Sequence, residues 1–136
     1  MKCCAVVDTN VIVSALITKD PQSPPRAVFR AMLSGDIVPL YHEDILAEYK
    51  DVLCRKKFRL QPETVQTVLN GICRFGMKVT PSPTGKILAD KDNLIFYEVA
   101  MTKRDCDAYL VTGNRKHFPI EDFIVTPAEM LAILQK

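Results

Sequence analysis

Short, continuously apolar runs alternate with longer amphipathic segments along the chain. Residues 4–7 are all apolar and end at Asp8, which is typical of a central parallel strand covered on both faces. Further strands are predicted at residues 37–41, 77–80, 108–111 and 123–125. Pro39 indicates limited pairing within the first of these later strands.

Helical periodicity fills most of the segments between the strands. Helices are predicted over residues 10–17, 25–34, 43–54, 62–75 and 90–103. A last helix begins after Thr126, because residues 126–129 combine a capping box with proline at the first helical position. Segment 90–103 is apolar nearly all round, so we expect it to be well buried. Alternating strands and helices predict a parallel α/β fold in a single domain over residues 1–136.

Composition narrows the class of protein and of partner. The 136 residues are 48% apolar and include 18 Lys and Arg against 16 Asp and Glu, for a net charge of +2. Any nucleic-acid binding must therefore depend on local patches or on a metal ion rather than on bulk attraction. We find neither the pattern of a signal peptide nor an apolar run long enough to span a membrane. We therefore expect a cytoplasmic protein without membrane contact.

The cysteines also favour a reducing compartment. They are Cys3, Cys4, Cys54, Cys73 and Cys106. Their odd number and the lack of a C-x-x-C pair argue against a disulfide framework and against a zinc site. We expect most of these thiols to be buried.

Several familiar catalytic motifs are incomplete in this chain. Residues 71–76 have the glycine spacing of a P-loop, but Met77 stands where the phosphate-binding Lys is required. No G-x-G-x-x-G occurs, and His42 lacks the second histidine of a helical zinc pair. His42 and His117 are too few to bind zinc alone, and we expect both at strand ends or turns.

The most informative polar residues are carboxylates. Asp8 directly follows the first predicted strand, and ligands of open parallel sheets bind beyond the carboxyl ends of the strands. A turn or helix-capping role for Asp8 is an equally good interpretation. Glu48 borders the apolar stripe of helix 43–54. For a single Glu, a solvated helix edge is the commoner explanation.

Two further groups of polar residues lie near predicted element ends. Asp90 and Asp92 precede the most apolar helix, where capping and the helix dipole also explain acidic residues. Thr112, Gly113 and Asn114 follow a predicted strand on the ligand-binding side of the sheet, although Gly-Asn is also an ordinary turn dipeptide.

Convergence of these carboxylates would require a metal ion. Three or four carboxylates in one pocket raise each other's pKa unless a hard divalent cation neutralises them. An oxygen-rich Mg²⁺ or Mn²⁺ site suits hydrolysis of a phosphodiester. Acyl transfer suits the chain less well, because it has no candidate catalytic triad.

Four motifs follow one another over almost the whole chain. They are Val7-Asp8-Thr9-Asn10-Val11, the isolated Glu48, Asp90-Lys91-Asp92-Asn93, and Tyr109-Leu110-Val111-Thr112-Gly113-Asn114. This order resembles the PIN-domain family and is most similar to its VapC-like toxin branch. The resemblance implies a three-layer α/β sandwich, with a parallel sheet of about five strands between helices. It also implies an acidic pocket that holds Mg²⁺ or Mn²⁺ and cleaves single-stranded RNA.

The resemblance assigns catalytic roles to individual carboxylates. Asp8 would be the first metal-binding carboxylate and Glu48 the second. For the third metal-binding carboxylate, the family often has two acidic residues that are three positions apart. In this chain these positions correspond to Asp90 and residue 93. This chain has Asn93 instead and offers Asp92 nearby. The third metal ligand is thus Asp90 or Asp92, and both are candidate catalytic residues.

The remaining assignments concern a fourth metal ligand and the substrate. Asn114 stands where the family frequently has Asp, and its amide oxygen can bind a hard cation without adding charge. Candidate residues for orienting water or phosphate are Thr9, Asn10, Asn93 and Thr112. Two basic stretches are candidates for binding RNA phosphates, one within residues 50–59 and the other formed by Arg115, Lys116 and His117. A solvated surface explains the first stretch equally well.

We therefore expect a Mg²⁺- or Mn²⁺-dependent endoribonuclease that is the toxin of a toxin-antitoxin pair. Its expected partners are single-stranded RNA, a cognate antitoxin and a second copy of the chain in a homodimer. The main alternative is a PIN-fold module with too few carboxylates to hold metal, which binds RNA or a partner protein. A phospho-acceptor signalling domain fits less well, because such domains place the acceptor at a later strand.

Overall fold

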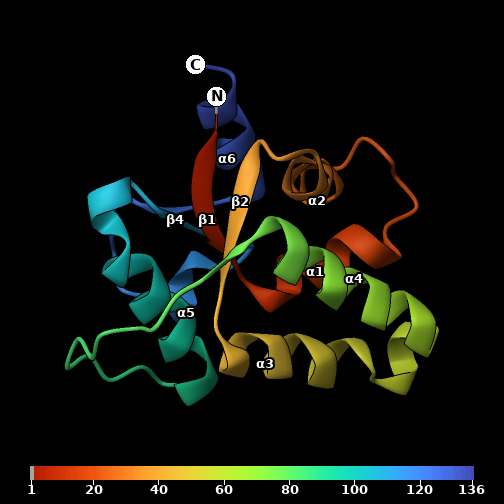
Figure 1. The fold of residues 1–136 in the computed structure, drawn as a ribbon, viewed down its shortest axis with the longest axis horizontal. Coiled ribbons are helices and arrows are strands. Elements are labelled where there is room, and N and C mark those ends of the chain that lie inside the picture. The colour runs from red at the N-terminus through yellow and green to blue at the C-terminus, as the bar shows by residue number, and fades with distance from the viewer. Residues whose placement is uncertain (1) are drawn as a thin grey trace.

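The computed structural model describes residues 2–136 and contains a five-stranded parallel sheet (Figure 1). The strands are β1 Cys3–Val7, β2 Ile37–Tyr41, β3 Met77–Lys78, β4 Tyr109–Val111 and β5 Ile124–Val125, and their order across the sheet is β3-β2-β1-β4-β5. Every neighbouring pair is parallel. The predicted α/β sheet is thus confirmed, with β3, β4 and β5 shorter than the predicted strands 77–80, 108–111 and 123–125.

Six α-helices follow the predicted pattern closely. They are α1 Thr9–Ile17, α2 Pro24–Ser34, α3 Glu43–Leu53, α4 Pro62–Phe75, α5 Lys91–Thr102 and α6 Pro127–Leu134. The predicted capping box is present at Thr126, whose hydroxyl accepts from the Glu129 amide while the Glu129 carboxylate accepts from the Thr126 amide. These local hydrogen bonds satisfy the otherwise unpaired amides at the start of α6.

Helices on both sides of the sheet give the predicted three layers. Helix α5 packs on β1, β2 and β4, whereas α2 and α4 pack on β2 from the other side and α6 packs on α2. Helix α3 contacts α1, α4 and α5, and in Figure 1 it runs across the lower end of the sheet, where β2 ends. The carboxyl ends of the strands therefore face α3 and the start of α5.

The core is centred on β1 and on the inner side of α5. Ala5, Val6 and Val7 are fully enclosed, as the continuous apolar run predicted. In α5, Phe96 and Tyr97 are buried, but Met101 is 37% exposed. Helix α5 is thus buried on the side that faces the sheet and open on the other, because only one layer covers it.

The prediction of mostly buried thiols is wrong. Within the described residues, Cys54, Cys73 and Cys106 are exposed, and Cys3 and Cys4 are partly exposed. The exposed thiols follow from their positions. Cys54 ends α3, Cys73 lies on the outer side of α4, and Cys106 lies in a short 3₁₀ turn, so each falls outside the apolar side of its element.

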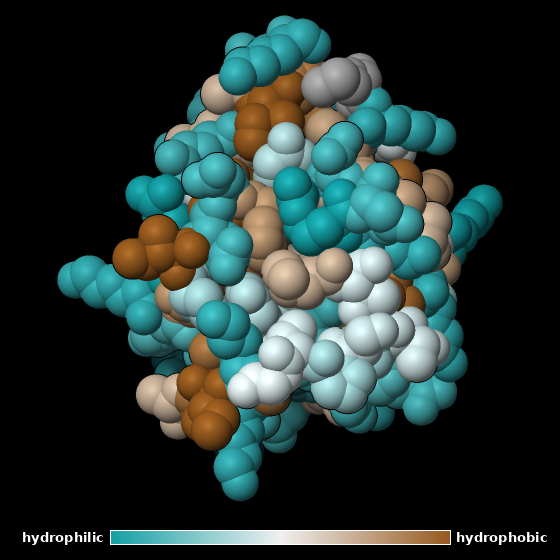
Figure 2. Space-filling view, turned by 90° about the vertical axis from the view of Figure 1, so that its left-hand side faces the viewer, coloured by the Kyte–Doolittle hydropathy of each residue, from teal (hydrophilic) through white to brown (hydrophobic). Residues whose placement is uncertain are grey.

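The surface and the helices can be compared with those expected of a membrane-spanning chain. The face that carries α5 is mostly hydrophilic, with apolar side chains in small separate groups (Figure 2). Among residues 2–136, we found no helix that is both long and apolar enough to cross a membrane.

The two glycines with P-loop spacing, Gly71 and Gly76, differ in how much space a side chain would have. Gly71 lies inside α4, where an added Cβ would meet the Leu33 side chain at an ordinary 3.5 Å. Gly76 joins α4 to β3, and an added Cβ would lie 2.5 Å from the Ile72 oxygen and closer still to the Pro39 oxygen. Only Gly76 is therefore needed for a close backbone approach.

We expect alanine to have opposite effects at these two positions. Gly71→Ala should raise the free energy of unfolding by about 0.5–1 kcal/mol, because alanine is the better helix former. Gly76→Ala should lower it by about 1–3 kcal/mol, because the backbone must shift to admit the methyl group. Urea denaturation of both variants measures the two changes. Equal stability of the two variants would contradict the packing described for Gly76.

Candidate functional site

The side chain of Asp8 is fixed where β1 and β4 end side by side. Strand pairing aligns Val7 with Val111, and the Asp8 amide donates to the Val111 oxygen at 2.8 Å. One carboxylate oxygen of Asp8 accepts from the Thr9 amide at 2.8 Å, and the other accepts from the Thr112 hydroxyl at 2.8 Å. Asp8 therefore caps α1, as one interpretation of the sequence proposed, and is also held from β4.

A cavity of about 450 Å³ brings Asp8 together with two other predicted carboxylates. Its polar lining residues from the predictions are Asp8, Glu48, Asp90, Thr9, Asn10 and Asn93. We call this cavity the acidic pocket. Its residues come from the end of β1, from α1, from α3 and from the start of α5. With the turn that carries His117, four stretches that are distant in sequence line the pocket, namely 8–14, 48–58, 90–93 and residue 117. They meet at the carboxyl edge of the sheet, where parallel α/β proteins bind ligands.

Helix α3 presents Glu48 to the acidic pocket through the residue next to it. Tyr49 is fully buried, and its hydroxyl donates to the backbone oxygen of Val7. Burial, followed by the negative charge of Asp8, raises the pKa of Tyr49, so its hydroxyl remains a hydrogen-bond donor. This buried contact fixes α3 against the end of β1 and leaves Glu48, one position earlier, at the edge of the pocket.

The start of α5 brings Asp90 rather than Asp92 to the acidic pocket. Asp90 is the N-cap of α5, and its carboxylate accepts from the Asp92 amide at 2.9 Å. Asp90 and Asn93 line the pocket, whereas Asp92 lies outside its lining. The capping role suggested by the sequence therefore coexists with a position at the pocket.

Negative charge accumulates around the acidic pocket. Burial raises the pKa of Asp8, and the charge of Asp90 adds to the rise, although hydrogen bonds from Thr112 and Thr9 and the charge of His117 oppose it. Partial burial raises the pKa of Glu48, and the charges of Asp92 and Asp51 raise it further. The carboxylates therefore stand close enough to destabilise one another's ionised forms.

A chain of hydrogen bonds links Asp8 to His117 on the other side of the pocket. Thr112, which donates to Asp8, accepts from the backbone amide of Asn114 at 3.0 Å. The side-chain amide nitrogen of Asn114 lies 3.2 Å from Nε2 of His117. An amide nitrogen only donates, so this contact places the proton of a neutral His117 ring on Nδ1. Asn114 itself lies outside the lining of the acidic pocket.

Three further pocket residues lay outside the predicted carboxylate site: Phe58 was not singled out, whereas Arg55 and His117 were predicted only as members of the two basic stretches proposed to bind RNA phosphates. All three line the acidic pocket. His117 was interpreted as a turn residue and indeed lies in a 3₁₀ turn, Arg115–His117. Its position three residues after Asn114 was the available signal. Arg55 follows the end of α3 and has extended backbone before the 3₁₀ turn Lys56–Phe58, so no helical spacing in the sequence indicated its place at the pocket.

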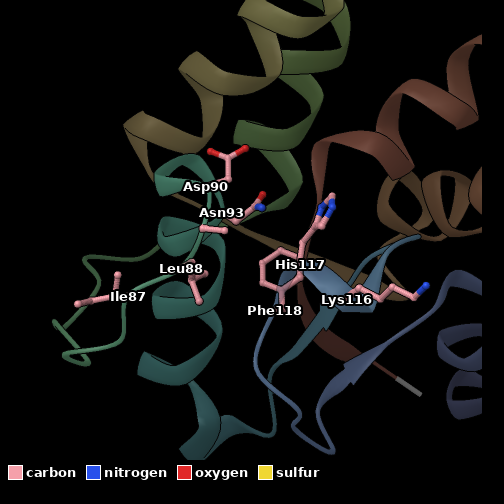
Figure 3. A pocket seen from close by; sticks show the side chains of 8 residues that line it. Ile87, Leu88, Asp90, Asn93, Lys116, His117 and Phe118 are labelled. Atoms are coloured by element: carbon pink, nitrogen blue, oxygen red, sulfur yellow. The ribbon is translucent and has the colours of Figure 1, made fainter.

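The predicted basic residues differ in their positions relative to the acidic pocket. Arg115 forms an ion pair with Glu129 at 3.4 Å. In Figure 3 the Lys116 side chain extends away from Asp90 and Asn93, whereas the His117 ring lies at the same level as Asn93. Arg55 lines the acidic pocket and pairs with Asp51 at 3.5 Å. Arg55, rather than Lys116, is therefore the positive side chain nearest to the carboxylates.

The donor atoms of the acidic pocket suit a hard divalent cation. Asp8, Glu48 and Asp90 offer carboxylate oxygens, which are the ligands that Mg²⁺ and Mn²⁺ prefer. The buried hydroxyl of Thr9 lacks a hydrogen-bond partner among residues 2–136. Within the same residues, no three His, Cys, Asp or Glu side chains are grouped closely enough to form a metal site. The side chains of the acidic pocket thus have the right chemistry for Mg²⁺ or Mn²⁺, but they are not preassembled into a metal site.

Comparison with known proteins identifies the family. No curated protein matches the chain significantly. A family model described as the PIN domain matches residues 4–116. The match includes every residue that lines the acidic pocket except His117, and PIN domains are generally nucleases. Because the match covers most of the 136 residues, the chain belongs to the PIN-domain family.

Proposed function

We propose that this protein is a metal-dependent endoribonuclease that hydrolyses phosphodiester bonds of single-stranded RNA, as the toxin of a toxin-antitoxin pair. The observation that carries the proposal is the meeting of Asp8, Glu48 and Asp90 in one pocket at the carboxyl edge of the sheet. Membership of the PIN-domain family supports a nuclease. The resemblance of the motifs to the VapC-like branch supports RNA and the toxin role.

Asp8, Glu48 and Asp90 are the residues that would hold Mg²⁺ or Mn²⁺, with Asp92 and Asn114 next to them. A cation bound here would offset the carboxylate charge, polarise a phosphate and lower the pKa of a bound water. The proposal gives Asp8 the central place, because its two hydrogen bonds hold it in one orientation. Glu48 and Asp90 are more exposed and can adjust to a ligand.

The chain itself supplies the groups that would bind and orient RNA. The His117 ring lines the acidic pocket, and a ring N–H group can donate to a phosphate oxygen. The Arg55 guanidinium lines the same pocket and can neutralise phosphate charge. The unpaired hydroxyl of Thr9 and the amide of Asn10, which accepts from the Gly113 amide at 3.4 Å, complete the polar rim.

One observation favours the alternative of a binding module. No preassembled metal site exists among residues 2–136, and Asn93 and Asn114 replace acidic residues of the family pattern. Such a module would bind RNA or a protein without cleaving it. Cleavage of single-stranded RNA that depends on added Mn²⁺ and stops with a chelator distinguishes the nuclease from this alternative.

The proposal extends to protein partners. We expect a cognate antitoxin and a second copy of the chain in a homodimer. A mainly apolar cavity of about 410 Å³ lies among α1, α2 and α4, lined by Leu16, Phe29, Leu33 and Val68 with polar residues at its edge. Leu33 is 43% exposed there, and exposed apolar concavities of this kind support a protein partner. A small open reading frame beside this gene is the expected sign of the antitoxin.

We expect Asp8→Asn to abolish cleavage while stabilising the fold. The rate on single-stranded RNA should fall by about 10²-fold or more, because the central carboxylate is lost. The folded state raises the pKa of Asp8, so its ionised form costs stability above that pKa, and the cost disappears below the unfolded value of about 3.9. The variant should therefore gain about 0.5–2 kcal/mol at neutral pH and nothing at pH about 3.

Asp107→Asn is the matched control for this variant. Asp107 is exposed, precedes β4 at the opposite edge of the sheet, and has φ 56°, a conformation that Asn also tolerates. We expect it to retain cleavage. Full activity in Asp8→Asn, or equal loss in both variants, would contradict the role of Asp8.

We also expect added negative charge at position 93 to tighten metal binding. Asn93 lines the acidic pocket in the first turn of α5, where an acidic side chain also suits the helix dipole. Asn93→Asp should therefore bind Mn²⁺ several-fold more tightly, or by about 1 kcal/mol. Asn114→Asp should have a smaller effect, because its side chain faces His117 instead. Calorimetric titration with Mn²⁺ measures both, and unchanged or weaker binding by Asn93→Asp would contradict the site.

A further inference from the structure

A second cavity opens beside the acidic pocket, between the segment that precedes α5 and the turn that follows β4 (Figure 3). Its volume is about 380 Å³. It shares Asp90, Asn93 and His117 with the acidic pocket. In Figure 3 these three side chains lie together in the upper part of the view, above Leu88 and Phe118. A ligand that reaches from one cavity to the other would therefore pass these three residues.

The walls of the second cavity are mainly apolar, and the polar residues Asp90, Asn93 and His117 lie on the side of the acidic pocket, whereas Lys116 lines the second cavity alone. Leu88 is half-buried, Phe118 is only 6% exposed, and Ile87 is 95% exposed at the outer edge. The amide of Asn93 and the carboxylate of Asp90 supply hydrogen-bonding groups. The cavity thus combines apolar faces with a polar edge that both accepts and donates hydrogen bonds.

This combination favours a nucleobase over other ligands. A base has two apolar faces and a polar rim, which proteins bind by stacking and by hydrogen bonds to its edge. A free phosphate would be attracted by Lys116, but it would meet the negative charge of Asp90 and would leave the apolar side chains of Leu88 and Phe118 without a partner. A purely apolar ligand would leave Asp90 and Asn93 without partners.

We infer that the second cavity is a base subsite, which holds the base of a nucleotide next to the phosphate in the acidic pocket. The inference rests on the proposed function, because it takes single-stranded RNA as the ligand. The three shared residues would then lie between the base and the phosphate of one strand. Binding at this subsite would select where the strand is cleaved.

A pocket-filling substitution tests the base subsite without any cleavage. Ala89 lines the cavity and is exposed, so Ala89→Phe would occupy the space of the base. Ala132→Phe makes the same change at an exposed position on α6 that is no part of either cavity. Fluorescence anisotropy in chelator and low salt would compare a short single-stranded RNA with an abasic strand of the same length.

We expect the wild-type chain and Ala132→Phe to bind the base-bearing strand about fivefold or more tightly than the abasic strand. Ala89→Phe should lose this difference. Leu88→Ala, which removes an apolar wall without filling the cavity, should reduce it as well, and thermal unfolding of each variant confirms that the fold is kept.

The outcome separates the base subsite from the proposed function. Equal binding of the two strands by the wild type, or an unchanged difference in both Ala89→Phe and Leu88→Ala, would overturn the subsite even if RNA is cleaved. A difference in affinity between the base-bearing and abasic strands that Ala89→Phe removes would support the subsite even if the chain cleaves no RNA. In that case only the proposed nuclease activity would be contradicted.

Discussion

The hydrogen bond from the Thr112 hydroxyl to the Asp8 carboxylate joins the ends of β1 and β4 and sets the position of the site. Thr112 is fully buried and Asp8 is 6% exposed, so neither group can turn to water instead. The parallel register of the two strands brings these side chains together. Asp8 also caps α1, and Tyr49 fixes α3 to the residue before Asp8. The sheet, the first helix and the helix that carries Glu48 therefore share one point of attachment.

The negative charge of the carboxylates around Asp8 opposes folding and favours the binding of a ligand. The carboxylates of Asp8, Glu48 and Asp90 line one pocket, and burial raises the pKa of both Asp8 and Glu48. Positive charge at the pocket comes from Arg55, which is shared with Asp51, and from His117 when it is protonated. An arrangement that destabilises its own ionised state is common at functional sites, because the ligand offsets the cost. This balance is why we interpret the pocket as a cation site rather than as a structural charge cluster.

Local sequence patterns predicted the sheet and its leading carboxylate, because both depend on neighbours in the chain. The apolar run before Asp8 predicted β1, and the stripe beside Glu48 predicted α3. The choice between Asp90 and Asp92 depended on the cap of α5, where both lie within one turn. The position of His117 beside Asp8 results from strand pairing between distant segments, which no local pattern reports. The thiols were mispredicted because cysteine was treated as a core residue without regard to its side of the helix.

We propose that the acidic pocket around Asp8 is the divalent-cation site of the protein. Paramagnetic broadening of backbone amide signals by substoichiometric Mn²⁺ tests it directly, because broadening falls steeply with distance from the ion. We predict that the signals of Thr9, Asn93 and Gly113 broaden first, while those near Asp107 at the opposite edge of the sheet persist. Broadening that begins near Asp107, or that spreads evenly over the chain, would contradict the account.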